Sequence, residues 1–136
     1  MIKVFAIGKT KEAYVREAVN IYLKRISRFS NVEWIECSKE QVSKSLEKNT
    51  FKIILEVTGK LVTSEELAAI FKKKLLEKEI VFYIGDEEGL SKEVREKADL
   101  LLSFSRMTFP HELARIMLLE QIYRALSINK GLPYHK

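Results

Sequence analysis

Two loops of this chain hold the residue types that could bind a ligand. The first is Gly85-Asp86-Glu87-Glu88-Gly89, in which glycine permits positive φ and close backbone approach to a flat ligand. Its spacing matches neither a dinucleotide fingerprint nor a P-loop, and three consecutive carboxylates would repel phosphates. The loop favours a ligand without phosphate groups, although an ordinary turn with an exposed acidic tip fits it equally well.

The second loop runs from Ser103 to His111 and mixes apolar with hydroxyl side chains. Because it lies between an apolar strand and an apolar helix, it could form one wall of a ligand site. A plain helix start explains the same residues, with Thr108 as the capping residue and Pro110 in the first turn, where its missing N–H is harmless. These residues alone leave both interpretations open.

The histidines and the cysteine form no recognisable metal-binding or nucleophilic pattern. No His/Cys cluster has the spacing of a metal site. Cys37 lies in an apolar run far in sequence from both histidines, so we expect a core residue and no thiol hydrolase. His111 is more often structural than catalytic. Tyr134 and His135 lie at a chain end, where such residues are more often incidental.

Apolar periodicity divides the chain into alternating strands and helices. Strands are expected over Ile2–Ile7, Val32–Cys37, Phe51–Val57, Ile80–Ile84 and Leu100–Phe104. Helices are expected over Lys11–Arg28, Glu40–Lys48, Thr63–Lys78, from about Ser91 onwards, and over Pro110–Asn129. This order predicts an α/β fold, a mostly parallel sheet flanked by helices, as a single domain over residues 1–136.

Ligands of such a sheet bind beyond the carboxyl ends of its strands. Three loops therefore stand out, at Val57–Lys60, Gly85–Leu90 and Ser103–Pro110. The helix that follows the third loop is apolar around nearly its whole circumference, whereas a surface helix would have a polar face. We expect this helix to be buried on several sides, within one chain or at a dimer interface. Glu120 and Arg124, four residues apart on it, could pair.

Composition and charge narrow the class of protein. The chain has 136 residues and a net charge of +5, which weakly favours a polyanionic partner such as nucleic acid. It has no apolar run of about 18 residues and no signal-peptide pattern at its start, so neither a membrane span nor secretion is expected. One cysteine cannot form an internal disulfide, and a reducing cytoplasm fits best.

Several strings of the chain, taken together, closely resemble one family. They are Phe82–Gly85, Gly89-Leu90, Leu102–His111, Glu120–Ala125 and the terminal Tyr134-His135-Lys136, together with the opening VFAIGKTKEAYVREAVNIYLKRI and the ILEVTGK strand. The chain is similar, from end to end, to the ribosomal large-subunit pseudouridine N3-methyltransferases of the SPOUT superfamily.

The resemblance implies a fold, a cofactor and an assembly. The fold would be SPOUT-type, with a C-terminal trefoil knot in which the last helix is threaded through a loop, and the assembly a homodimer. The cofactor would be S-adenosylmethionine, with no metal. Carried over by motif, its binding residues would be Leu55, Gly85, Phe104, Ser105, Arg106, Met107, Thr108 and Phe109.

The implied substrate is a pseudouridine of 23S ribosomal RNA within the assembled ribosome. Basic residues would then contact phosphates, and the candidates are Lys9, Lys11, Arg16, Arg106 and Lys130. Each of them alone is also explained as solvated surface. Two rival functions stay open: methylation of another RNA such as tRNA by the same fold, and a non-enzymatic, ribosome-associated RNA-binding module.

Methylation of N3 requires a ring nitrogen that loses its proton and lies in line with a methyl sulfonium. We expect His135 or Tyr134 to position or deprotonate the base, and Arg124 to stabilise negative charge on the uracil carbonyls. These groups could act across the dimer. The chain departs from the family at Asp86, where a second glycine is common, and in its short Ser38–Thr50 region.

Overall fold

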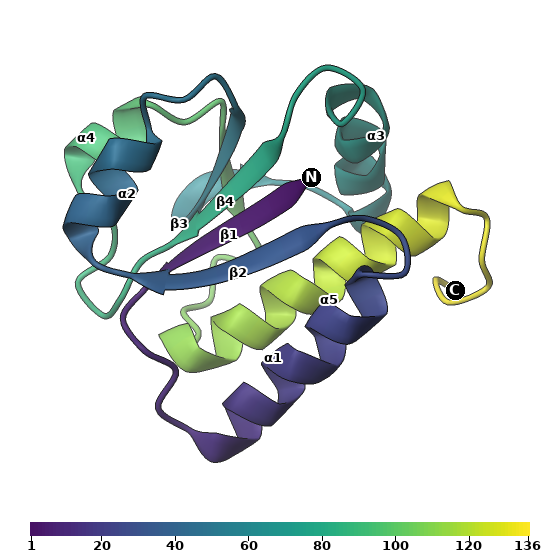
Figure 1. The fold of residues 1–136 in the computed structure, drawn as a ribbon, viewed down its shortest axis with the longest axis horizontal. Coiled ribbons are helices and arrows are strands. Elements are labelled where there is room, and N and C mark those ends of the chain that lie inside the picture. Colours follow the sequence, from purple (N-terminus) through teal and green to yellow (C-terminus); the bar gives the residue numbers. More distant parts are fainter.

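A five-stranded sheet, in the order β2-β1-β4-β3-β5, forms the centre of the computed structural model, which describes residues 1–136 (Figure 1). The strands are β1 (Ile2–Ile7), β2 (Val32–Cys37), β3 (Phe51–Leu61), β4 (Ile80–Ile84) and β5 (Leu100–Ser103). Every neighbouring pair is parallel. The predicted α/β class and the mostly parallel sheet are confirmed.

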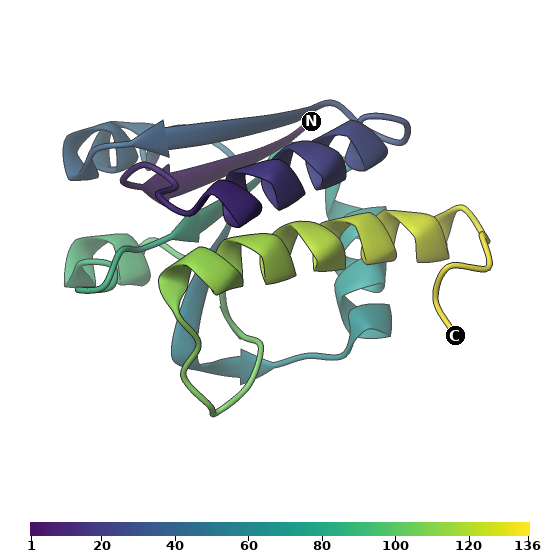
Figure 2. The ribbon, with the colours of Figure 1, turned by 90° about the horizontal axis from the view of Figure 1, so that it is seen from below.

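Five helices cover the two faces of the sheet. They are α1 (Ala13–Ile26), α2 (Lys39–Ser45), α3 (Ser64–Lys74), α4 (Lys92–Glu96) and α5 (His111–Asn129). Helices α1, α3 and α5 contribute to the larger buried cluster, and α2 and α4 contribute to the smaller one. Helices α1 and α5 lie side by side and begin at the same end of the molecule (Figure 2).

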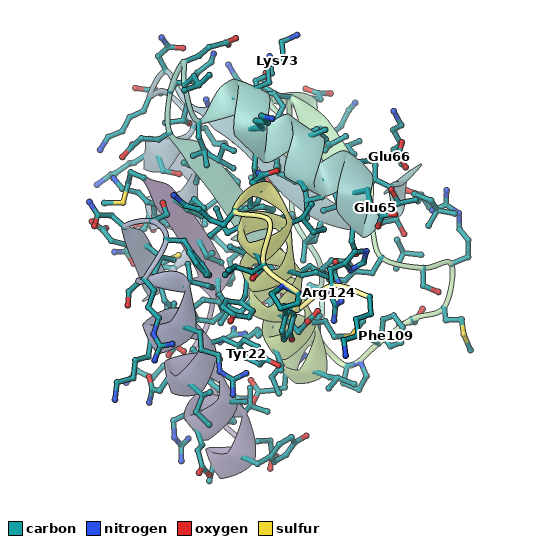
Figure 3. All side chains as sticks on the ribbon, turned by 90° about the vertical axis from the view of Figure 1, so that its right-hand side faces the viewer. Tyr22, Glu65, Glu66, Lys73, Phe109 and Arg124 are labelled. Atoms are coloured by element: carbon teal, nitrogen blue, oxygen red, sulfur yellow. The ribbon has the colours of Figure 1, made fainter.

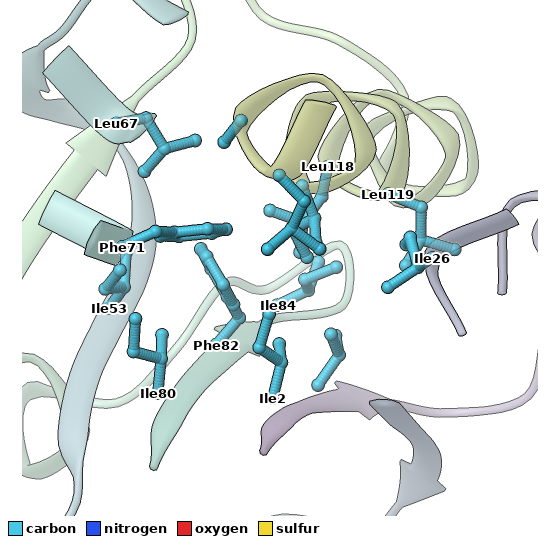
Figure 4. Close-up of a cluster of buried hydrophobic side chains, with 14 of the residues drawn as sticks. Ile2, Ile26, Ile53, Leu67, Phe71, Ile80, Phe82, Ile84, Leu118 and Leu119 are labelled. Carbon is cyan, nitrogen blue, oxygen red and sulfur yellow. The ribbon is translucent and has the colours of Figure 1, made fainter. Parts of the chain in front are cut away.

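Strand β4 shows why the sheet is buried on both faces. Ile80, Phe82 and Ile84 point into the larger cluster, where Phe82 packs edge-on against Phe71 of α3 (Figure 4). Val81 and Tyr83 point to the opposite face and join the smaller cluster. The alternation agrees with side chains that leave a strand on opposite faces. It confirms the strand expected over Ile80–Ile84, whose five residues are all apolar, as in parallel strands buried on both faces.

Strand β3 is longer than its apolar pattern predicted, because it pairs with β5 twice. Leu55 and Lys60 both lie opposite Leu102, so the intervening residues 56–59 bulge out of the ladder. At the end of this bulge a Cβ on Gly59 would lie 2.6 Å from the Leu101 carbonyl oxygen. Residues Val57–Lys60, expected as a loop after the strand, therefore form a bulge and the start of a second ladder that only glycine accommodates.

The starts of two helices differ from those expected from the sequence. Helix α1 begins at Ala13 rather than Lys11, because the Glu112 carboxylate of α5 accepts hydrogen bonds from the backbone amides of Lys11 and Glu12, at 2.9 and 2.8 Å. Helix α5 has Pro110 at its N-cap, without a side-chain capping bond. The alternative in which Thr108 caps this helix is wrong, since the cap lies two residues later.

Helix α5 buries one side deeply and leaves the other half exposed. Leu118, Leu119 and Ile122 belong to the larger core, whereas Leu113 keeps 37% of its surface exposed and Met117 is half-buried. Within one chain, the expected burial on several sides is therefore only partly achieved. The threading of this helix through a knot stays a prediction.

Arg115 fixes α5 to the first strand. It is 1% exposed, and its Nη2 donates to the carbonyls of Ile7 at 2.8 Å and Gly8 at 2.9 Å, while Nη1 donates to the Thr10 hydroxyl at 2.8 Å. Glu36 lies 3.5 Å from Nη1. Burial raises the pKa of Glu36, but hydrogen bonds from Thr10 and Trp34, with the charge of Arg115, outweigh it and lower that pKa.

We expect Arg115→Leu to destabilise the protein by about 3–5 kcal/mol, because it leaves three buried acceptors and a carboxylate without their cation. Urea unfolding followed by circular dichroism measures the loss. Arg28→Leu, which removes the same charge at an exposed position without a side-chain contact, should change stability far less. Equal effects of the two substitutions would contradict the structural role of Arg115.

Candidate functional site

A cavity of about 200 Å³ lies at the carboxyl ends of β3, β4 and β5. Segments from all three predicted ligand loops meet in it. Its walls are Leu55, Glu56, Val57, Ile84, Gly85, Asp86, Gly89, Leu90, Leu102, Ser103, Phe104, Ser105, Met107 and Phe109, with His111 and Ala114 from α5. The cavity lies where ligands of parallel sheets bind.

The structure brings together six of the eight residues that the sequence assigned to a cofactor. Leu55, Gly85, Phe104, Ser105, Met107 and Phe109 line the cavity. Arg106 and Thr108 are exposed and do not line it. The Arg106 guanidinium instead donates to the Val57 carbonyl, and so ties the loop before α5 to the bulge of β3.

The Gly85–Gly89 loop is a tight turn whose two glycines are needed for different reasons. Gly89 has φ +78°, a conformation that side chains rarely adopt. A Cβ on Gly85 would lie 2.7 Å from the carbonyl carbon of Gly89. Asp86 closes the turn, accepting hydrogen bonds from the Glu88 amide at its carboxylate and from the Gly89 amide at its carbonyl, at 3.0 and 2.9 Å.

The charges around the cavity suit a cation better than a phosphate. No lysine or arginine lines it, and two carboxylates, Glu56 and Asp86, do. Glu56 is paired with Arg95, whose Nη1 lies 3.7 Å from its Oε2, so Asp86 is the lining carboxylate without an ion pair. The remaining walls are largely apolar. A positively charged sulfonium ligand without phosphate groups therefore fits this donor set, whereas a nucleoside triphosphate does not.

A second cavity, of about 510 Å³, lies on the other side of the β5 end. It shares Leu102, Ser103 and Phe104 with the first cavity and is otherwise lined by residues of α3, of α5 and of the turn before α3, among them Ser64, Glu120 and Gln121. The Ser64 hydroxyl donates to the side-chain amide oxygen of Gln121 at 2.6 Å. The Leu102–Phe104 segment is thus a thin wall between two cavities along α5.

The three residues predicted to do the chemistry gather around Glu120. Arg124 donates to the Glu120 carboxylate through Nη2 at 2.9 Å and Nε at 3.3 Å, which confirms the predicted pairing. The Tyr134 hydroxyl donates to the same carboxylate at 2.7 Å. The guanidinium of Arg124 lies 4.8 Å from the Tyr134 ring centroid and contacts His135 Nδ1 at 2.9 Å.

The environment of Tyr134 keeps its hydroxyl protonated. Burial, together with the hydrogen bond to Glu120 and the charge of that carboxylate, raises the pKa of Tyr134 to about 12. A phenol with this pKa carries its proton at neutral pH and donates a hydrogen bond. The proton-accepting role that the sequence left open between Tyr134 and His135 is therefore better suited to His135.

The tail cluster and the cavity lie at different points along α5. The cavity touches this helix at His111 and Ala114, and Arg124 lies ten residues beyond Ala114, about 15 Å along a helix that rises 1.5 Å per residue. Figure 3 shows Arg124 on the side of the molecule where Glu65 begins α3. The tail of one chain, docked this way, does not reach its own cavity.

Sequence reasoning missed the role of one carboxylate in these sites and missed a second carboxylate altogether. Asp86 was expected in a candidate ligand loop and noted as a departure from a family pattern, but its hydrogen bonds that close the turn at the cavity wall were not expected. Glu65, whose Oε1 lies 2.9 Å from His135 Nε2, belongs to the first turn of α3 and had no signal beyond its position after a helix cap. A contact across 70 residues cannot be read from spacing.

Neither a metal centre nor a membrane span is found. No group of three or more His, Cys, Asp or Glu side chains is arranged to hold a metal ion. No helix is both long and apolar enough to cross a membrane.

Comparison with known proteins shows the family to which the chain belongs. The family model described as "Predicted SPOUT methyltransferase" matches residues 1–135. The chain belongs to the SPOUT methyltransferase family. Two relatives named ribosomal RNA large subunit methyltransferase H are each 42% identical to it. The relative from Coprothermobacter proteolyticus aligns with it over 137 residues, which cover 99% of each chain. The relative from Caldicellulosiruptor bescii aligns with it over 154 residues, which cover the whole of both chains.

Solved structures of low sequence identity share the fold. A TrmH/SpoU tRNA modifying enzyme of A. aeolicus is 15% identical, with a TM-score of 0.56 over 96% of this SPOUT chain and 77% of its own. The SpoU methyltransferase AviRb of Streptomyces viridochromogenes, in complex with the cofactor AdoMet, is 10% identical, with a TM-score of 0.52 over 96% of this chain and 58% of its own.

The protein is therefore an S-adenosylmethionine-dependent methyltransferase. Bound cofactor supplies an electrophilic methyl group on a sulfonium. The cavity with two carboxylates and no basic residue fits such a ligand. The fold of the chain alone places the cavity at the carboxyl ends of the strands and brings the three loops together around it.

We expect Gly85→Ala to weaken S-adenosylmethionine binding by at least about tenfold, a cost of about 1.4 kcal/mol, because the new Cβ would displace the Gly89 backbone and distort the cavity wall. Isothermal titration calorimetry measures the affinity, and thermal unfolding checks that the variant is folded. An unchanged affinity in a folded variant would show that this turn does not shape the cofactor site.

Proposed function

We propose that this protein methylates N3 of a pseudouridine in 23S ribosomal RNA on the assembled ribosome. The observation that carries the proposal is the end-to-end similarity to relatives named for the ribosomal RNA large subunit, at 42% identity. The tail cluster supports it, since Arg124, Tyr134 and His135 form a polar group suited to a nucleobase.

The cofactor is proposed to occupy the cavity at the strand ends. Leu55, Gly85, Phe104, Ser105, Met107 and Phe109 would contact it directly. Arg106 would act from outside the cavity, because its bond to the Val57 carbonyl holds the β3 bulge in place. Thr108 would shape the exposed part of the loop before α5. Asp86 is the carboxylate placed to favour its positive charge, whereas the charge of Glu56 is partly balanced by Arg95.

The tail cluster is proposed to handle the nucleobase. Arg124 would place positive charge beside a uracil carbonyl, where negative charge develops as N3 loses its proton. His135 would take that proton, and Tyr134, protonated at neutral pH, would position the ring by hydrogen bonding. None of these roles requires a metal ion.

A homodimer is proposed to complete the site. Helix α1 presents an exposed apolar stripe that includes Tyr14, 60% exposed, and Ile21, 44% exposed, spaced seven residues apart on one face. The half-exposed Leu113 and Met117 of α5 add to the apolar surface of the neighbouring helix. Burying these helices against a second copy would bring the tail of one chain towards the cavity of its partner.

Phosphate contacts are proposed for the exposed lysines Lys9, Lys11 and Lys130. Arg16 and Arg106 are less available, because the guanidinium of Arg16 donates to the carbonyls of Thr10 and Lys11 and that of Arg106 donates to the carbonyl of Val57. The reaction would take place in the cytoplasm, where ribosomes and a free cysteine such as Cys37 are both expected. Residues 1–136 would act as one domain, with α5 threaded through a trefoil knot.

The substrate is tested by methyl transfer in vitro. Radiolabelled S-adenosylmethionine is offered with intact ribosomes, isolated 23S RNA and bulk tRNA, and mass spectrometry of RNA fragments locates the product. We expect one methyl group on a pseudouridine of ribosomal 23S RNA and none on tRNA. Labelled tRNA would favour the rival substrate, and cofactor binding without transfer to any RNA would favour a non-enzymatic module.

The dimer is tested by sedimentation velocity. We expect the wild type to sediment as a dimer and the double variant Ile21→Glu, Leu113→Glu as a monomer, because two buried charges per chain would oppose association. Leu76→Glu, at a leucine that is 88% exposed after α3, is the matched control and should stay dimeric. A monomeric wild type, or a dimeric double variant, would contradict the proposed interface.

A further inference from the structure

The C-terminal tail folds back on α5 rather than extending from it (Figure 2). Gly131 adopts φ +70° directly after the helix, and the Leu132 amide donates to the Ser127 carbonyl at 3.1 Å. The reversal brings the Tyr134 ring edge-on against Tyr123, with centroids 4.8 Å apart. His135 is thereby placed between α5 and the start of α3.

Both ring nitrogens of His135 have partners, and these partners define its tautomer. Nδ1 lies 2.9 Å from Nη1 of Arg124, and a guanidinium only donates hydrogen bonds. Nδ1 must therefore carry a lone pair. Nε2 lies 2.9 Å from Oε1 of Glu65, and a carboxylate accepts, so the ring proton is on Nε2.

We propose that Glu65 is a positioning residue that orients His135 with Nδ1 as its proton-accepting nitrogen. This inference rests on the proposed function, in which His135 takes the proton of the target nucleobase. The carboxylate does not touch the substrate. It accepts a hydrogen bond from Nε2–H and leaves the other ring nitrogen, Nδ1, for the reaction.

Arg124 connects this orientation to substrate binding. In the free protein its Nη1 covers the Nδ1 lone pair. When a uracil carbonyl draws the guanidinium away, Nδ1 becomes free to accept. The N3–H bond of the base then breaks and the Nδ1–H bond forms. The electron pair left on N3 would bond to the methyl group as the bond between that methyl group and the sulfonium sulfur breaks, its electrons staying on sulfur. Glu65 balances the positive charge that the ring gains.

The charged groups around His135 assign this role to Glu65 and not to Glu120. Glu120 is engaged by Arg124 and Tyr134 and makes no hydrogen bond to the imidazole. Glu65 is 64% exposed at its side chain, whereas His135 is 28% exposed. The two residues come from different elements, so their contact depends on the folded tail and can be removed without touching the core.

The orientation is tested first by NMR of protein labelled with nitrogen-15 histidine. The chain has two histidines, so His111 serves as an internal reference for the signals of His135. We expect the Nε2–H tautomer in the wild type, with an Nε2 proton that exchanges slowly with water because the Glu65 carboxylate accepts it. In Glu65→Ala, where Arg124 still donates to Nδ1, this proton should exchange quickly, and in Glu65→Gln, whose amide oxygen still accepts, it should exchange slowly again. An Nδ1–H tautomer in the wild type, or equal exchange of the Nε2 proton in the wild type and Glu65→Ala, would overturn the proposal.

The consequence for the reaction is tested by steady-state kinetics on ribosomes. We expect Glu65→Ala to lower kcat by about tenfold or more, with KM for the ribosome and cofactor affinity nearly unchanged, since a misoriented base loses part of the 10²–10⁴-fold that proton transfer can contribute. Glu65→Gln should recover part of the rate. Glu47→Ala, an exposed glutamate with no hydrogen bond or ion pair, should be as active as the wild type.

His135→Ala separates this proposal from the proposed function. Wild-type activity in His135→Ala, or an unchanged kcat in Glu65→Ala, would overturn the positioning role while leaving the methyltransferase assignment intact. If the wild type transfers no methyl group to ribosomes, the proposed function fails, and the tautomer measured by NMR alone decides whether Glu65 orients His135.

Discussion

The burial of α5 is the constraint on which the rest of this structure depends. The helix is apolar on nearly every side, and one side packs Leu118, Leu119 and Ile122 into the core. Arg115, fully buried on the same helix, binds the carbonyls at the end of β1. Because α5 is fixed by these contacts, the side chains at its two ends are fixed as well. At one end His111 and Ala114 line the cavity proposed for the cofactor, and at the other Arg124 holds the tail.

This arrangement separates two tasks along one rigid element. The cavity at the strand ends is apolar, free of basic residues, and built from backbone turns that need glycine, which suits a sulfonium cofactor. The tail cluster is polar and partly exposed, and it is the part proposed to bind the nucleobase. About 15 Å of helix lies between them, so the two halves act on one nucleobase only if a second chain brings its tail to the cavity. The exposed apolar stripes of α1 and α5 supply a surface for that association.

The fold and part of the site could be predicted from the sequence, for identifiable reasons. The uniform apolar run of β4 and the alternation of strands and helices are local patterns, so they predicted the parallel sheet directly. The second pairing of β3 was not predictable, because it depends on the close approach of Gly59 to Leu101. The start of α1 was misplaced because its amides are capped by Glu112, a hundred residues away. The Glu65–His135 contact was missed for the same reason: it exists only once the tail has folded back.

The claim that one chain's tail serves its partner's cavity is tested most directly by subunit complementation. Two variants that we expect to be impaired, Gly85→Ala and a chain lacking residues 134–136, are unfolded together, refolded and assayed for methyl transfer to ribosomes at a cofactor concentration that does not saturate Gly85→Ala. A site shared between chains predicts that the mixture is more active than either variant alone, because a mixed dimer joins an intact cavity to an intact tail. A mixture that forms mixed dimers and is no more active than either variant alone would contradict the account.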